Sequence, residues 1–149
     1  MRKFILVFLA AFFVLASGFS QSAEKISEIL ESEEISKGQA SYFVCVYKNL
    51  GGESLSEADS FSLLAEKGLF KAGEDAEERI SLSKACFLIA ESAQMKGGIF
   101  YSVFHSPRYA LREFYALGIV PQSAAPGQKV SGSEFIALLN EFEKKGKTK

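Results

Sequence analysis

The side chains best suited to bind a ligand are gathered in one short segment of the chain. They are His105, Arg108, Tyr109, Arg112 and Tyr115. The two arginines are four residues apart, so on a helix they lie on one side. Guanidinium groups beside aromatic rings could hold a sugar ring by stacking, or an acidic polymer by charge-assisted hydrogen bonds. The alternative interpretation is that the arginines only solvate a helix while the tyrosines complete its core.

No segment has the spacing of a reaction centre. His105 is the only histidine, and no nucleophile elbow, zinc-ligand spacing or phosphate-binding loop accompanies it. A calcium loop ending near Val130 would need carboxylates at its first, third and fifth positions, which are Ser123, Ala125 and Gly127. The sequence therefore predicts a non-catalytic protein that holds no metal and no cofactor.

The elements that must position this segment belong to a repeat. An apolar residue followed by a serine opens an apolar run three times, about 45 to 50 residues apart, which is a period typical of repeated helical units. The three pairs are Ile35-Ser36, Ile80-Ser81 and Val130-Ser131.

Each repeated serine is expected to cap a helix by accepting a hydrogen bond from a free backbone N–H of the first turn. In the first and third phrases, Gln39 and Glu134 stand three residues after the serine and can complete a capping box. The second phrase has Lys84 at that position, so only the serine half of the box should form.

The apolar spacing after each cap is helical. Phe135, Leu138, Leu139 and Phe142 form one stripe, and residues 85–90 are apolar on most of the helix circumference, which predicts the most buried helix. Further helices are expected at residues 25–30, 56–67 and 107–117. The predicted fold is all-α, with three helix-loop-helix repeats around a pseudo-threefold three-helix core. Residues 99–104 are left open between a short strand and packed coil.

The N-terminal residues have the layout of a secretory signal peptide. A basic start, Met1-Arg2-Lys3, precedes an apolar stretch from Phe4 to Ala16 and then small residues. Cleavage is expected after Ser20, or else after Ala23, with an uncleaved anchor as the alternative. The pattern predicts an exported protein of the periplasm or cell envelope. No later segment is apolar and long enough to span a membrane, and a mature net charge of about −3 does not suggest a nucleic-acid surface.

The predicted domain boundaries follow from these patterns. Residues 1–20 form the signal peptide, residues 21–145 form one domain with repeats at 24–50, 56–96 and 106–145, and residues 146–149 form a disordered basic tail. Cys45 and Cys86 both fall inside apolar helical runs. Export favours a disulfide between them, whereas their surroundings are equally consistent with two small buried thiols.

The three units together resemble S-layer homology repeats over nearly all of residues 24–145. Residues 109–139 match best, through Leu117-Gly118-Ile119, Pro126-Gly127 and the phrase from Val130 to Phe135. The resemblance implies three repeats in a pseudo-trimer that anchors an exported protein non-covalently to cell-wall polysaccharide. In that family an arginine in the repeated phrase helps to hold the anionic glycan.

This sequence departs from the family at the arginine. Its position is occupied by Lys37, Leu82 and Gly132 in the three phrases, so only the first keeps a cation. Lysine also lacks the bidentate fork of arginine.

The expected function is therefore that of an exported, non-catalytic cell-envelope binding or scaffolding module attached to an anionic envelope glycan. Lys37, Arg108, Arg112 and Tyr109 are the expected ligand-binding residues. The alternative is an envelope protein–protein interaction module that does not bind glycan, which the loss of the motif arginines favours.

Overall fold

Helices supply the regular secondary structure of residues 23–51 and 55–146, which are the residues described by this computed structural model. After a first helix at residues 23–31 come α2 (Lys37–Tyr47), α3 (Glu57–Glu66), α4 (Leu82–Ser92), α5 (Ile99–Phe104), α6 (Pro107–Ala116) and α7 (Gly132–Gly146). The all-α prediction is confirmed for this part of the chain. The predicted signal peptide lies outside it. So do residues 147–149 of the predicted tail, whereas Gly146 still belongs to α7. Within the described ranges, no helix has both the length and the apolar character needed to cross a membrane.

The predicted helix caps are present. The Ser36 hydroxyl accepts a hydrogen bond from the Gln39 N–H, and the Gln39 side chain accepts one from the Ser36 N–H, which completes the capping box of α2. At α7, Glu134 accepts from the Ser131 N–H at 2.8 Å and its own N–H donates to the Ser131 hydroxyl at 3.2 Å. At α4 only the serine half of the box forms, as the lysine at its third position predicts.

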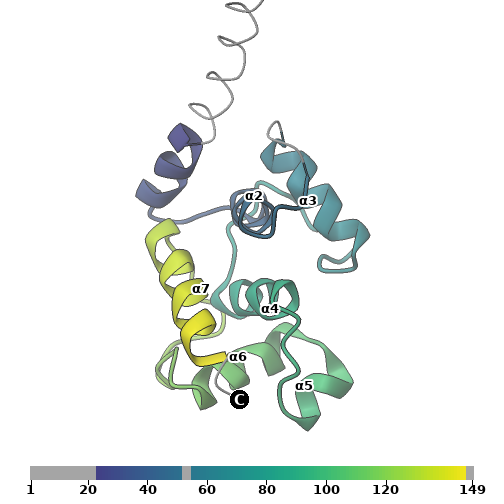
Figure 1. Cartoon of the computed structure of the whole chain (residues 1–149), viewed down its shortest axis with the longest axis vertical. Coiled ribbons are helices and arrows are strands. Elements are labelled where there is room, and N and C mark those ends of the chain that lie inside the picture. The colour runs from purple at the N-terminus through teal and green to yellow at the C-terminus, as the bar shows by residue number, and fades with distance from the viewer. Residues whose placement is uncertain (1–22, 52–54, 147–149) are drawn as a thin grey trace, which may run out of the picture.

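Helix α4 lies in the middle of the fold, between α2 and α3 on one side and α6 on the other, with α7 alongside (Figure 1). Every residue of α4 from Lys84 to Ala90 is buried. This burial and the central position of the helix agree with the prediction that it is the most buried one. The stripe predicted for α7 also faces inward: Phe135, Leu139 and Phe142 are buried and Leu138 is half-buried.

The three apolar residues that precede the cap serines meet inside the protein. The Ile35 N–H donates to the Val130 carbonyl at 2.9 Å, and the Ile80 N–H donates to the Ile35 carbonyl at 3.0 Å. Each of the three side chains is at most 1 % exposed. Segments far apart in the sequence are therefore joined by backbone hydrogen bonds at the start of the core helices.

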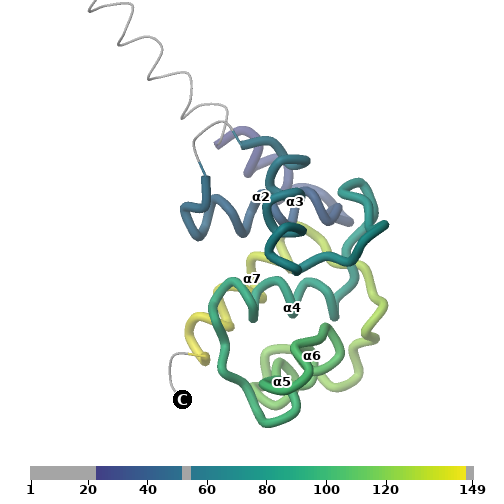
Figure 2. The backbone as a smooth tube through the Cα atoms, turned by 90° about the vertical axis from the view of Figure 1, so that its right-hand side faces the viewer, coloured from purple at the N-terminus to yellow at the C-terminus, as the bar shows by residue number. Residues whose placement is uncertain are grey.

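The loops that precede the second and third phrases are bound in matching ways. An isolated antiparallel bridge pairs Ser36 with Arg79, and another pairs Ser81 with Lys129. The first residue of α2 donates its N–H to the carbonyl of Glu78 at 2.8 Å, and the first residue of α4 does the same to Gln128 at 2.8 Å. Each of these two core helices is thus fixed by the loop that leads into the next phrase (Figure 2).

Residues 99–104 form neither a strand nor coil but the six-residue helix α5. Its N-cap is Gly98, and it ends at His105, which has the left-handed values φ 37° and ψ 61°. Tyr101 is the one buried residue of this helix. Tyr101 is therefore the side chain through which α5 enters the core.

The two cysteines are free buried thiols. Burial raises the pKa of both, and most strongly that of Cys86, in the central helix. Of the two interpretations left open, this arrangement corresponds to small apolar core residues with little thiolate character.

Candidate functional site

Helix α6 carries three of the four predicted ligand-binding residues. Ser106 is its N-cap residue and Pro107 its first residue, although the Ser106 side chain makes no capping hydrogen bond. Leu111 and Phe114 are buried in the core, where α6 packs against α4. This orientation leaves Arg108 and Arg112 exposed.

The two arginines line one pocket. It has a volume of about 740 Å³ and lies between α6, the first turn of α4 and the loop that leads to Val130. Its wall consists of Ser83, Ser106, Pro107, Arg108, Leu111, Arg112, Tyr115 and Pro126. The predicted surface is therefore concave, with two cations and one tyrosine on its wall.

The positive charge in this pocket is not neutralised by an ion pair within the described part of the chain. Among the described residues, neither Arg108 nor Arg112 takes part in an ion pair. The Arg112 guanidinium lies 5.9 Å from the centre of the Tyr109 ring, within the range of a cation–π contact. Tyr109 itself is half-buried and does not line the pocket, so its contact with the pocket is indirect, through Arg112. Both guanidinium groups remain available to an anion.

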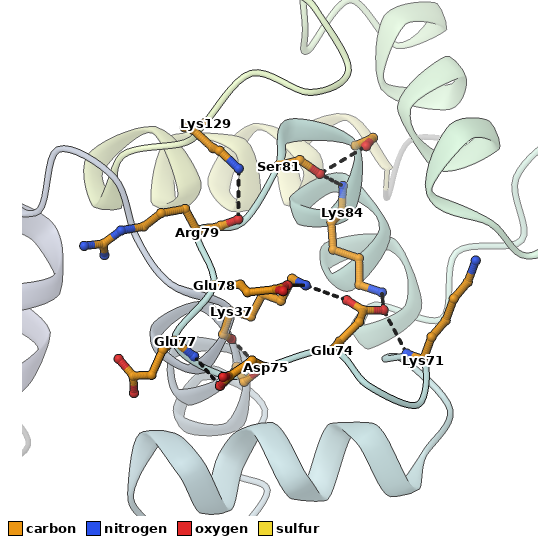
Figure 3. A network of polar contacts seen from close by, with 12 residues as sticks. Lys37, Lys71, Glu74, Asp75, Glu77, Glu78, Arg79, Ser81, Lys84 and Lys129 are labelled. Atoms are coloured by element: carbon orange, nitrogen blue, oxygen red, sulfur yellow. Dashed lines mark hydrogen bonds and ion pairs between the residues drawn. The ribbon is translucent and has the colours of Figure 1, made fainter.

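Lys37, the fourth predicted residue, is placed differently. Its ammonium group forms ion pairs with Glu74, at 2.9 Å, and with Glu78, and its side chain is only 11 % exposed. Glu74 also pairs with Lys84 at 3.1 Å, so two lysines share one carboxylate (Figure 3). Lys37 is not part of the pocket that holds the arginines.

The charged groups of this network shift one another's pKa values. Burial alone would raise the pKa of Glu74, but the backbone N–H of Lys71 and the ammonium groups of Lys37 and Lys84 lower it to about 2. Burial alone would lower the pKa of Lys37, and the hydrogen bonds and charges of Glu78 and Glu74 instead raise it. The pKa of Lys84 is lowered because burial outweighs its pairing with Glu74.

Leu82, which stands at the arginine position of the second phrase, lines a different pocket. This pocket has a volume of about 450 Å³ and lies between α7 and the loop after α6. Ile119, Val130 and Leu138 are among its apolar residues, and Glu134 and Glu141 are its acidic ones. Where the first phrase places an ion-paired lysine, the second therefore contributes to an apolar pocket.

His105 does not line the arginine pocket. Its Nδ1 atom lies 2.9 Å from a carboxylate oxygen of Glu91, and the same oxygen accepts a hydrogen bond from the Tyr101 hydroxyl. The predicted cluster at residues 105–115 thus separates into a pocket-lining pair of arginines and a histidine that holds the end of α5. The described residues contain no group of three or more histidine, cysteine or acidic side chains suited to a metal ion.

Sequence reasoning missed the exposed apolar surface of α5. Ile99 is 81 % exposed, Val103 67 %, Phe100 59 % and Phe104 57 %. Because these residues are spaced four apart in two pairs, a helical interpretation of residues 99–104 would have grouped them. The segment contains too few residues for a helical period to be distinguished from a strand or coil.

Comparison with known proteins adds no further constraint. No protein-family model matches the chain, and no curated protein matches it.

Proposed function

We propose that this chain is an exported, non-catalytic cell-envelope module composed of three degenerate repeats similar to S-layer homology repeats. The pseudo-threefold arrangement in this proposal is supported by the meeting of Ile35, Ile80 and Val130 and by the matching bonds that tie α2 and α4 to the following loops. A further bond, from the Gly132 N–H to the Ser32 carbonyl at 3.0 Å, joins the last repeat to the first.

The observation that carries the binding proposal is a pair of arginines in one pocket that form no ion pair with any residue the structure describes. An anionic glycan offers carboxylates or phosphates for the guanidinium groups, and it offers sugar faces that pack on an aromatic ring. Arg108, Arg112 and Tyr115 supply these groups on one wall, and Ser83 adds a hydroxyl from α4. In this proposal Arg108 and Arg112 hold the charge of the glycan and Tyr109 orients Arg112.

Lys37 contributes differently in this proposal. An anion would have to compete with two carboxylates for its ammonium group, so Lys37 binds ligand more weakly than the arginines and mainly joins α2 to the loop containing Glu74 and Glu78. The two roles can be separated by experiment, because Lys37→Ala should lower stability more than Arg108→Ala does.

The test is co-sedimentation of the exported chain with purified envelope polysaccharide from the source organism, over a salt series. We expect salt-sensitive binding that falls about tenfold or more in an Arg108→Ala, Arg112→Ala double variant, because charge-assisted hydrogen bonds contribute about 1.5–3 kcal/mol each. Lys67→Ala is the matched control, since it removes an exposed cation at the end of α3. Absence of pelleting at low salt by folded protein would exclude the glycan proposal.

A second candidate function, a protein–protein interaction module without glycan binding, is favoured by the apolar pocket beside Leu82. A leucine at the arginine position removes the anion-binding group and leaves a cavity suited to an apolar side chain of a partner. In that case the double arginine variant would leave envelope binding unchanged, whereas Leu138→Asp, which places a charge in this pocket, would abolish it.

A further inference from the structure

The exposed side of α5 is unusual for a protein surface. Four of its six residues are large apolar side chains that are more than half exposed, namely Ile99, Phe100, Val103 and Phe104. Single exposed apolar residues are common on soluble domains, but several together mark a surface that meets something else.

This surface projects from the fold and is not recessed. Both views place α5 at the periphery, at the opposite end of the protein from the helix at residues 23–31 (Figures 1 and 2). Tyr101 alone points into the core, where its hydroxyl donates to Glu91. Gly97, with φ 57°, precedes the helix, and a side chain there would come within 2.6 Å of the Tyr101 ring. Gly97 therefore lets the Tyr101 ring pack closely against the backbone at the start of α5.

Aromatic rings extend the surface from α5 onto α6. The Tyr109 ring stacks on Phe104 at 5.3 Å and on Phe100 at 5.8 Å, and the Arg112 guanidinium lies on the same tyrosine. The apolar surface of α5 is therefore continuous with Tyr109, which has an aromatic ring and a polar hydroxyl, and with the Arg112 cation beside it. Such aromatic residues are favoured where hydrocarbon meets water.

Three exposed cations and two engaged or half-buried carboxylates flank α5. Lys96 precedes it, Arg108 and Arg112 follow it, and all three are exposed. The nearby carboxylates are Glu91, which is engaged by Tyr101 and His105, and Glu113, which lies beside Gly98. A short apolar projection next to exposed cations is the chemistry by which proteins bind at the interface of an anionic bilayer.

We propose that α5 docks this protein on the surface of an anionic phospholipid bilayer. Ile99, Phe100, Val103 and Phe104 enter the boundary between headgroups and acyl chains, and the neighbouring cations contact the lipid phosphates. A projecting apolar surface flanked by Lys96 and Arg112 needs no complementary groove, which distinguishes a bilayer from a folded partner or a second copy of this chain. The inference goes beyond glycan binding, because α5 lies outside the arginine pocket.

The test is vesicle co-sedimentation of the exported chain, whose N-terminus is determined by mass spectrometry. One set of vesicles contains phosphatidylcholine alone, and the other contains equal parts of phosphatidylcholine and phosphatidylglycerol. The variant is Ile99→Ser with Val103→Ser, which removes two side chains that the core does not need. Val46→Ser is the matched control, because Val46 is also exposed, at 44 %, but lies on α2.

We expect binding to the anionic vesicles that weakens with salt, and a fall of about tenfold or more in the partition coefficient of the double variant. The control should bind like the unchanged chain, and all three proteins should have the same melting temperature. Polysaccharide binding by the double variant should be unchanged, which separates this proposal from the previous one.

Three outcomes would overturn the proposal. The first is that the unchanged chain does not pellet with anionic vesicles at low salt. The second is that the double variant binds these vesicles as well as the unchanged chain does. The third is concentration-dependent self-association in analytical ultracentrifugation that the double variant abolishes, since it would assign α5 to a second copy.

Discussion

Replacing Gly132 by alanine tests how the last repeat closes on the first. Gly132 is the first residue of α7, and its N–H donates to the Ser32 carbonyl at 3.0 Å. A Cβ atom added there would lie 1.8 Å from the carbonyl oxygen of Ile29 and 3.0 Å from the Cα of Leu30. These are backbone atoms at the end of a helix, so no side-chain rotation can relieve the overlap. The helix at residues 23–31 must move away from α7.

The expected cost follows from that displacement. Overpacking costs about 1–3 kcal/mol, and contact with backbone places this substitution at the upper end of the range. Loss of the bond to Ser32 adds about 1 kcal/mol. The better helix propensity of alanine offsets up to about 1 kcal/mol of this destabilisation. The free energy of unfolding should therefore fall by about 3 kcal/mol, which corresponds to a decrease of about 12 °C in the melting temperature of a domain of this size.

Thermal unfolding followed by circular dichroism provides the measurement, with Gly127→Ala as the matched control. Gly127 has open space around the position of its missing Cβ and does not adopt a positive φ, so alanine there should leave stability nearly unchanged or slightly increased. If the two variants melt within about 3 °C of each other, the close approach of α7 to the first helix is refuted.

Two further predictions concern the ion network and the thiols. Glu74→Gln should destabilise the protein by about 2–3 kcal/mol at pH 7, because it leaves Lys37 without one of its partners. Since the pKa of Glu74 falls from 4.5 to about 2, its contribution is present above pH 4.5 and is lost as the pH falls towards 2. Urea unfolding between pH 2 and 7 should therefore show a weaker pH dependence for this variant than for Glu77→Gln, and equal curves would contradict the prediction. Cys45 and Cys86 should both resist alkylation in the native protein and both react after unfolding without a reductant. Mass spectrometry would contradict this if the denatured, unreduced chain took up no alkyl group.

The helix starts could be predicted because their information is local. A serine, its first-turn N–H groups and the residue three positions later lie within a single turn, so their spacing determines which half of the capping box forms. The same reasoning predicted that α4 would lack the second half, because Lys84 offers no acceptor. The buried stripe of α7 was predictable for a related reason, since fifteen residues are enough to show a helical period.

The environment of Lys37 could not be predicted, because its partners are remote in the sequence. A cation at the arginine position resembles a ligand-binding group when only its neighbours in the chain are considered. Glu74 and Glu78 follow about forty residues later in a loop, and only the fold brings them to within ion-pairing distance. The miss at α5 has another cause, because six residues are too few to show a helical period.

Helix α6 is the element common to the two proposed surfaces, and this affects how their tests must be interpreted. Its arginines line the pocket on one side, while Tyr109 contacts α5 on the other. Arg112 belongs to both, because it lines the pocket and lies over the tyrosine ring. Loss of Arg112 would therefore weaken glycan binding and bilayer binding together and could not distinguish them. Substitutions in α5 separate the two activities, because they leave both pocket arginines in place.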